Sequence, residues 1–161
     1  MIATTSLESY ASQQRAAPRW VFDSLVWIKA TGEGTDGRLS LVEPVIPAGF
    51  ASPWHVHHTE DELLYVIEGS VTVLVGNSRT SLQPGGCSFG PRGVPHGFRV
   101  QGGQPAHLLL LTTSGDFANF ILEASEPATS PTLPKPQEPD LARLNALTAK
   151  YGGEILGPLP D

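Results

Sequence analysis

The chain has 161 residues, the length of one ordinary domain, and 40% of them are hydrophobic, which suffices for a sizeable core. The formal net charge of −6 provides no basic surface, so nucleic acid and anionic membranes are not expected as partners. Apolar runs extend for only a few residues, far short of a membrane span.

The N-terminal segment is polar and shows no clear periodicity. We therefore expect a loose arm over residues 1–18. This segment lacks the basic start and the continuous apolar stretch of a signal peptide. The chain contains one cysteine, which excludes an internal disulfide framework. A cytoplasmic protein is the resulting expectation.

Residues 19–126 have the pattern of an antiparallel β-domain. Short runs rich in β-branched, aromatic or leucine residues alternate with Gly, Pro and Asn. Period-2 stretches such as 71–75, with turn residues about every 8–12 positions, indicate strands. Residues 68–70 and 76–78 are predicted hairpin turns. The sequence thus predicts an all-β sandwich or barrel.

The pattern changes after Gly115. Asp116 is predicted to cap a short helix that carries Phe117, Phe120 and Ile121 on one face.

The remaining residues, 127–161, begin with a proline-rich segment over 127–139, which predicts an extended surface connector. Asp140 is the predicted N-cap of a second short helix, and Gly152 is its predicted stop. Because a short amphipathic helix is marginal alone, we expect this segment to pack on the barrel or on a partner.

Four residues point to a metal site. In a strand, residues i and i+2 face the same side, so His55 and His57 project into one space. Two buried imidazoles need polar partners, and a metal ion satisfies both. Glu62 opens an apolar strand, where it would add an anionic oxygen. His96 follows a Pro-Arg-Gly turn and opens another apolar strand, which makes it the candidate fourth ligand.

Other polar and aromatic residues near these positions have simpler structural explanations. They are expected to be solvated turn charges (Glu60, Asp61, Glu68), surface cations (Arg92, Arg99), ordinary histidines (His58, His107), core aromatics (Trp54, Tyr65, Phe98) and an inert buried thiol (Cys87).

The spacing of the candidate ligands resembles the first of two sequence motifs of the cupin superfamily. That motif has Gly, His-x-His, Glu and Gly at fixed intervals. Here these positions are Gly49, His55, His57, Glu62 and Gly69.

The second motif is matched by Gly85, Pro91, Gly93 and His96, and it departs from the family at Val100, where Asn is usual. That departure does not touch a ligand position. The resemblance implies a double-stranded β-helix, the jelly-roll cupin barrel, with short C-terminal helices. It also implies metal ligation by His55, His57, Glu62 and His96.

Three imidazoles and one carboxylate suit one divalent transition ion: Fe, Mn, Co, Ni, Cu or Zn. They disfavour Ca and Mg, which prefer oxygen ligands. Four protein ligands on an ion that accepts five or six leave room for water, dioxygen or a chelating small-molecule substrate.

A narrower resemblance concerns small single-domain bacterial cupins of the quercetin 2,3-dioxygenase-like type. It is carried by HVHHTEDELLYVIEG, FGPRGVPHGF and a closing helix that ends in KYGGEILGP. The resemblance implies a dioxygenase in which Glu62 is both ligand and general base for a flavonol-like or other enolisable substrate. It also implies a homodimer.

Two alternatives remain open from the residues alone. One is a non-oxidative isomerase, cyclase or lyase that acts on a polyketide or sugar-like substrate with the same metal and Glu62. The other is a non-catalytic module that binds a small molecule in the barrel mouth.

Overall fold

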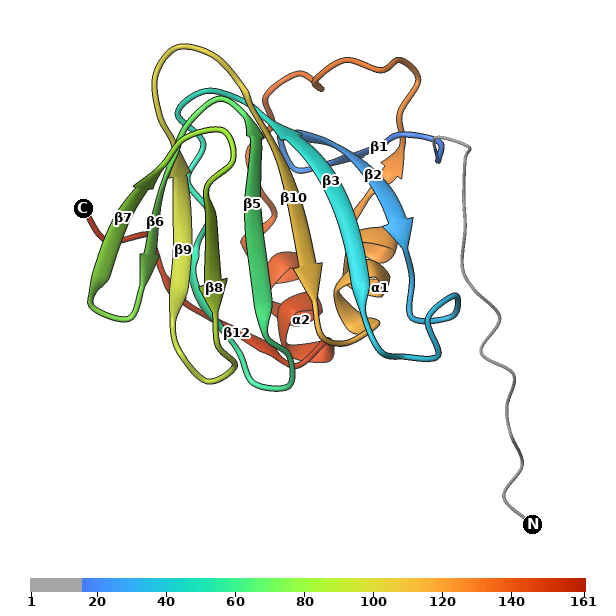
Figure 1. Cartoon of the computed structure of the whole chain (residues 1–161). Helices are drawn as coiled ribbons and strands as arrows, with labels where there is room; N and C mark the ends of the chain where they lie inside the picture. The colour runs from blue at the N-terminus through green and yellow to red at the C-terminus, as the bar shows by residue number, and fades with distance from the viewer. Residues whose placement is uncertain (1–15) are drawn as a thin grey trace.

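Two antiparallel sheets face each other in the computed structural model, which describes residues 16–161 (Figure 1). Residues 1–15 of the expected N-terminal arm lie outside the described residues. The first sheet has seven strands, in the order β11 (Glu126–Pro127), β1 (Arg19–Val21), β2 (Ser24–Ala30), β3 (Ser40–Ile46), β10 (Ala106–Thr112), β5 (Glu62–Glu68) and β8 (Cys87–Gly90).

The second sheet has five strands, in the order β12 (Gly153–Gly157), β4 (Trp54–His57), β9 (His96–Val100), β6 (Val71–Val75) and β7 (Ser78–Leu82). Every strand pair in the two sheets is antiparallel. The predicted all-β architecture is confirmed.

The core lies between the two sheets, where apolar side chains of strands from both sheets meet. In β10, buried positions alternate with half-buried ones along the whole strand, as a strand with one face toward a core requires. Leu108 of β10, Val66 of β5 and Val71 of β6 are fully enclosed there.

The two predicted hairpin turns have different outcomes. Residues 76–77 connect β6 to β7, whose ends pair at Val75 and Ser78, so that hairpin is confirmed. Residues 69–70 instead carry the chain from β5 in one sheet to β6 in the other. Gly69 has a φ of +80°, and a Cβ there would lie 2.8 Å from the backbone of Ala106. The turn is therefore real, but the hairpin prediction for it was wrong.

Helix α1 (Asp116–Ala124) follows β10, and its cap differs from the prediction. The N-cap is Gly115, and Asp116 is the first helical residue. The Asp116 N–H donates to Ser114 Oγ at 3.1 Å, so the serine supplies the acceptor that the aspartate was expected to supply.

Helix α2 (Leu141–Lys150) starts as predicted, because the Asp140 carboxylate accepts the Arg143 N–H at 3.0 Å. Gly152 follows the helix with a φ of +78°, the left-handed conformation expected beyond a C-cap. In Figure 1 both helices lie behind the seven-stranded sheet. Neither is long and apolar enough to cross a membrane, and no other helix occurs in the described part of the chain.

Strand β12 follows α2 and was not predicted. It pairs with β4, with Gly153 opposite His57 and Ile155 opposite His55. The segment after α2 therefore lies directly against the strand that carries two of the candidate metal ligands.

Candidate metal centre

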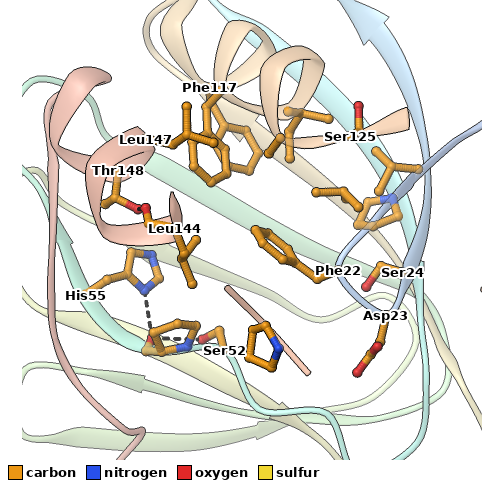
Figure 2. Close-up of a pocket in the computed structure, with 18 of the residues that line it drawn as sticks. Phe22, Asp23, Ser24, Ser52, His55, Phe117, Ser125, Leu144, Leu147 and Thr148 are labelled. Atoms are coloured by element: carbon orange, nitrogen blue, oxygen red, sulfur yellow. Dashed lines mark hydrogen bonds between the residues drawn. The ribbon is translucent and has the colours of Figure 1, made fainter. Parts of the chain in front are cut away.

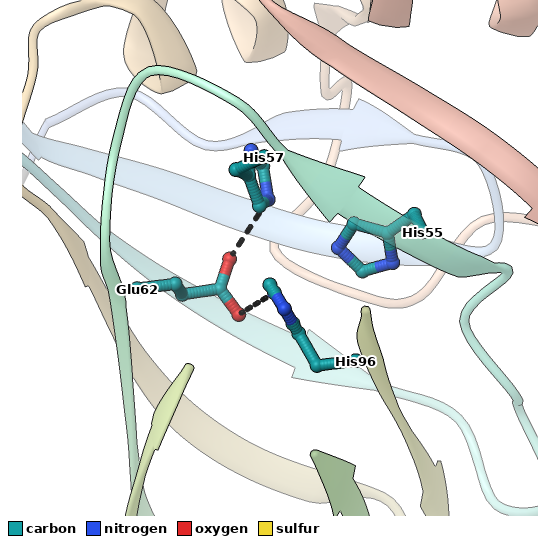
Figure 3. A group of neighbouring side chains, drawn as sticks. All are labelled: His55, His57, Glu62 and His96. Atoms are coloured by element: carbon teal, nitrogen blue, oxygen red, sulfur yellow. Dashed lines mark ion pairs between the residues drawn. The ribbon is translucent and has the colours of Figure 1, made fainter. Parts of the chain in front are cut away.

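The four predicted ligands converge between the two sheets (Figure 3). His55 and His57 come from β4 of the five-stranded sheet, and His96 opens β9 directly opposite His55. Glu62 opens β5 of the other sheet. One ligand atom from each residue lies within 4.8 Å of those of the others, a spacing that one metal ion can bridge.

Backbone carbonyls fix two of the three rings. His55 Nδ1 lies 2.8 Å from the carbonyl of Pro53, and His96 Nδ1 lies 2.9 Å from that of Val94. A carbonyl only accepts, so each Nδ1 carries the proton and donates it. The lone pair of each ring is then on Nε2.

The third ring, His57, is held by a carboxylate. Its Nδ1 lies 3.1 Å from Glu60 Oε1, and the Glu60 side chain is 2% exposed. The expectation that Glu60 is a solvated turn charge was therefore wrong. Burial of Glu60 is possible because the Ser114 hydroxyl donates to its other oxygen at 2.5 Å. The partner is distant in sequence, so no local pattern indicates it.

Two inward-facing nitrogens, His57 Nε2 and His96 Nε2, are buried without a hydrogen-bond partner among the described residues. Glu62 is the nearest anionic group, with its oxygens 3.5 Å from His57 Nε2 and 3.9 Å from His96 Nε2. Orphaned buried nitrogens around a carboxylate fit a bound cation, because metal ligation would satisfy them.

The charges of the site also fit a cation. Burial raises the pKa of the Glu62 carboxyl, but the surrounding imidazoles, His57 first among them, together lower that pKa by more, to about 2. Burial lowers the pKa of His57, but Glu60 and Glu62 together raise it by more, to about 10. Burial lowers the pKa of His55 to about 4, so that ring is neutral at pH 7. A divalent ion would displace the His57 proton and match the charge of the two carboxylates.

A cavity of about 730 Å³ opens beside the site, and His55, His57 and Glu62 lie on its wall. Figure 2 shows Phe22, Phe117, Leu144 and Leu147 around it, with His55 at one side. The apolar lining comes from strands of both sheets, with β3 prominent among them, and from α1 and α2. Among its described lining residues, Arg143 is the one lysine or arginine.

Several other residues have the ordinary roles predicted for them. His58 is exposed and pairs with Glu154 at 3.2 Å, and His107 pairs with Glu43 at 2.8 Å, both away from the four ligands. Phe98 is buried in the core as expected.

Two predictions of burial were wrong. Cys87 is exposed, and Tyr65, opposite it in the β5–β8 pair, is 38% exposed. Both residues lie on the outer face of the seven-stranded sheet, because a strand's register decides which of its faces is buried.

The Cupin_2 family, described as the cupin domain, matches residues 42–112. This part of the chain is similar to a cupin domain. Residues 42–112 include all four candidate ligands. The match agrees with the two-sheet architecture, and the predicted jelly-roll fold is confirmed.

Solved cupin-fold structures resemble the chain at low sequence identity. KdgF from Halomonas sp. is 21% identical with a TM-score of 0.52, over 60% of this chain and 84% of that one. The polyketide cyclase RemF from Streptomyces resistomycificus is 22% identical with a TM-score of 0.55, over 65% of this chain and 79% of that one. These likenesses establish the fold.

A curated relative, the uncharacterized protein MJ1618 from Methanocaldococcus jannaschii, is 29% identical over 72 residues. The match covers 45% of this chain and 58% of the relative, so the chain spans little more than half of that protein.

Proposed function

We propose that this cupin binds one divalent transition ion on His55, His57, Glu62 and His96 and acts as a dioxygenase on an enolisable aromatic small molecule. The proposal is carried by one observation: three imidazole Nε2 atoms and a carboxylate converge on the wall of a largely apolar cavity. Nitrogen and oxygen donors in this ratio suit a first-row transition ion.

The cavity supports an aromatic substrate over a sugar phosphate. Its volume of about 730 Å³ falls within the range of small-molecule pockets. The rings of Phe117 and Phe120 stack with centroids 6.0 Å apart. The rings of His57 and Phe117 form a T-shaped pair with centroids 6.3 Å apart. This aromatic wall connects directly to the metal site. A phosphate group would need several cations, and Arg143 alone is available among the described lining residues.

Glu62 is the residue proposed to move a proton. When bound, the ion would lower the pKa of a coordinated substrate hydroxyl and provide an open position for an oxygen ligand. Glu62 would accept the hydroxyl proton on a carboxylate oxygen, because its side chain lies on the wall of the cavity. The apolar walls would exclude bulk water from the resulting enolate.

The test begins with metal analysis of untagged protein and continues with oxygen-electrode assays on flavonols and related enols. Turnover per bound ion in Glu62→Gln should fall by roughly 10²–10⁴, the usual value of a positioned general base. Glu68→Gln is the matched control, because Glu68 ends the same strand and is exposed.

Each outcome separates the proposal from its alternatives. Equal rates per ion in wild type and Glu62→Gln would refute the base role. Substrate conversion without oxygen uptake would indicate a non-oxidative isomerase, cyclase or lyase. Binding without turnover would leave a small-molecule binding module.

A further inference from the structure

The three histidines of the site differ in the group that holds Nδ1. His55 and His96 donate to neutral backbone carbonyls two residues away, at 2.8 and 2.9 Å. His57 alone faces a carboxylate, Glu60 Oε1, at 3.1 Å. A charged acceptor fixes the ring and also makes its opposite nitrogen a stronger donor to a metal ion.

Glu60 is itself held in place by contacts within the protein. Its side chain is 2% exposed, and the Ser114 hydroxyl donates to Glu60 Oε2 at 2.5 Å. Ser114 lies between β10 and α1, and its Oγ also accepts the Asp116 N–H at the start of α1. The carboxylate therefore bridges the loop after β4 and the loop that starts the helix lining the cavity.

We propose that Glu60 is a positioning residue, which holds His57 with Nε2 toward the ion and strengthens that nitrogen as a ligand. The inference rests on the proposed metal binding. Glu60 does not touch the ion: its Oε1 contacts Nδ1, on the side of the ring opposite the inward-facing Nε2. Ser114 aims Glu60 by occupying its second oxygen.

The experiment measures zinc affinity by competition with a chromophoric chelator, in wild type and in Glu60→Gln. The amide oxygen of glutamine can still accept the Nδ1–H, so the variant removes the charge with little change of shape. Loss of a carboxylate partner behind a ligand histidine typically weakens metal binding 10- to 100-fold, and we expect about 10-fold here. Ser114→Ala should give a smaller loss.

Asp61→Asn is the matched control, because Asp61 is the next residue but pairs with the exposed Arg92 at 2.9 Å. It should bind zinc as wild type does. A loss in Asp61→Asn equal to that in Glu60→Gln would overturn the inference, since it would indicate general damage to the loop.

A second readout separates positioning from a purely structural role. In the zinc-loaded protein, nitrogen–proton correlation spectra of the histidine rings should show a changed His57 signal in Glu60→Gln. The signals of His55 and His96 should stay in place, because their carbonyl partners are untouched. Equal movement of all three would overturn the inference.

The two proposals fail differently. A wild-type protein that does not bind zinc, nickel, cobalt, manganese or iron would refute the proposed metal function. If Glu60→Gln binds zinc as tightly as wild type does, the proposed metal function stands and the role of Glu60 is refuted.

Discussion

Replacing one of two neighbouring histidines should abolish metal-dependent stabilisation, whereas replacing the other should not. His57 is buried with its Nε2 among the candidate ligands, and His58 is exposed and pairs with Glu154 at 3.2 Å. The variants His57→Ala and His58→Ala therefore change adjacent residues, but the first alters the buried face of the strand and the second its exposed surroundings. The readout is the rise in melting temperature when metal is added to chelator-treated protein.

The expected rise follows from where the ligands come from. They lie on β4, β5 and β9, in both sheets, so the unfolded chain has no comparable site. Free metal at 100 times the dissociation constant then stabilises the native state by about 2.7 kcal/mol. For a domain of this size, about 1 kcal/mol shifts the melting temperature by about 2–4 °C, so the rise should be about 5–11 °C.

The metal-induced increment is the quantity to compare, because His57→Ala also leaves Glu60 and Glu62 without their ring partner and lowers metal-free stability. At the same metal concentration, His58→Ala should keep the full increment and His57→Ala should lose nearly all of it. Retention of the increment in His57→Ala would show that the assigned ligand set is wrong.

Three further predictions test the surroundings of the site. Gly90→Ala places a methyl group 3.2 Å from the His96 ring, and we expect roughly tenfold weaker metal binding by chelator competition. Gly103→Ala, with nothing within 4 Å, should bind normally. Hydrogen bonds from Arg92 lower the pKa of the Asp61 carboxyl from its ordinary value of 3.8, so the ionised carboxylate stabilises the fold at pH values above 3.8. This stabilisation is lost progressively as the pH falls below 3.8 and the carboxylate becomes protonated. In urea unfolding, Asp61→Asn should therefore be less stable than wild type at pH 7, and the difference should shrink below about pH 4; a pH-independent difference would contradict this. Light scattering should detect the expected homodimer, and the 17.1 kDa mass of one chain at high concentration would contradict it.

The residues predictable from sequence are those whose placement depends on local geometry. His55 and His57 share a face because strand side chains alternate, and the hairpin at 76–77 follows from its turn residues. Asp140 was recognisable as an N-cap because its acceptor role involves a residue three positions ahead.

Other features depend on partners that no local pattern identifies. Glu60 is buried only because Ser114 satisfies its second oxygen, and the two lie 54 positions apart. Cys87 looks like a core residue in sequence, but the register of β8 turns it outward. Strand β12 is five residues long, begins and ends with glycine, and follows closely after a helix, so its pairing with β4 decides its conformation.

The parts of the chain that shape the cavity lie largely outside the matched domain. Residues 42–112 hold the four candidate ligands, whereas Phe117, Leu144 and Leu147 come later in the chain. Strand β12 also lies beyond the match, and it pairs with β4 opposite His55 and His57.

This division separates two properties physically. The candidate ligands determine which ions the domain can hold, because the type of donor atom and the spacing between donors are set by residues on the barrel strands. The size and polarity of the cavity depend on α1 and α2, whose apolar faces close over it. Substitutions in these helices that do not touch His57 should therefore change which small molecule binds while leaving metal affinity unaltered. We expect the two properties to be coupled where α1 reaches His57, through the contact with Phe117 and through the link from Asp116 by way of Ser114 and Glu60.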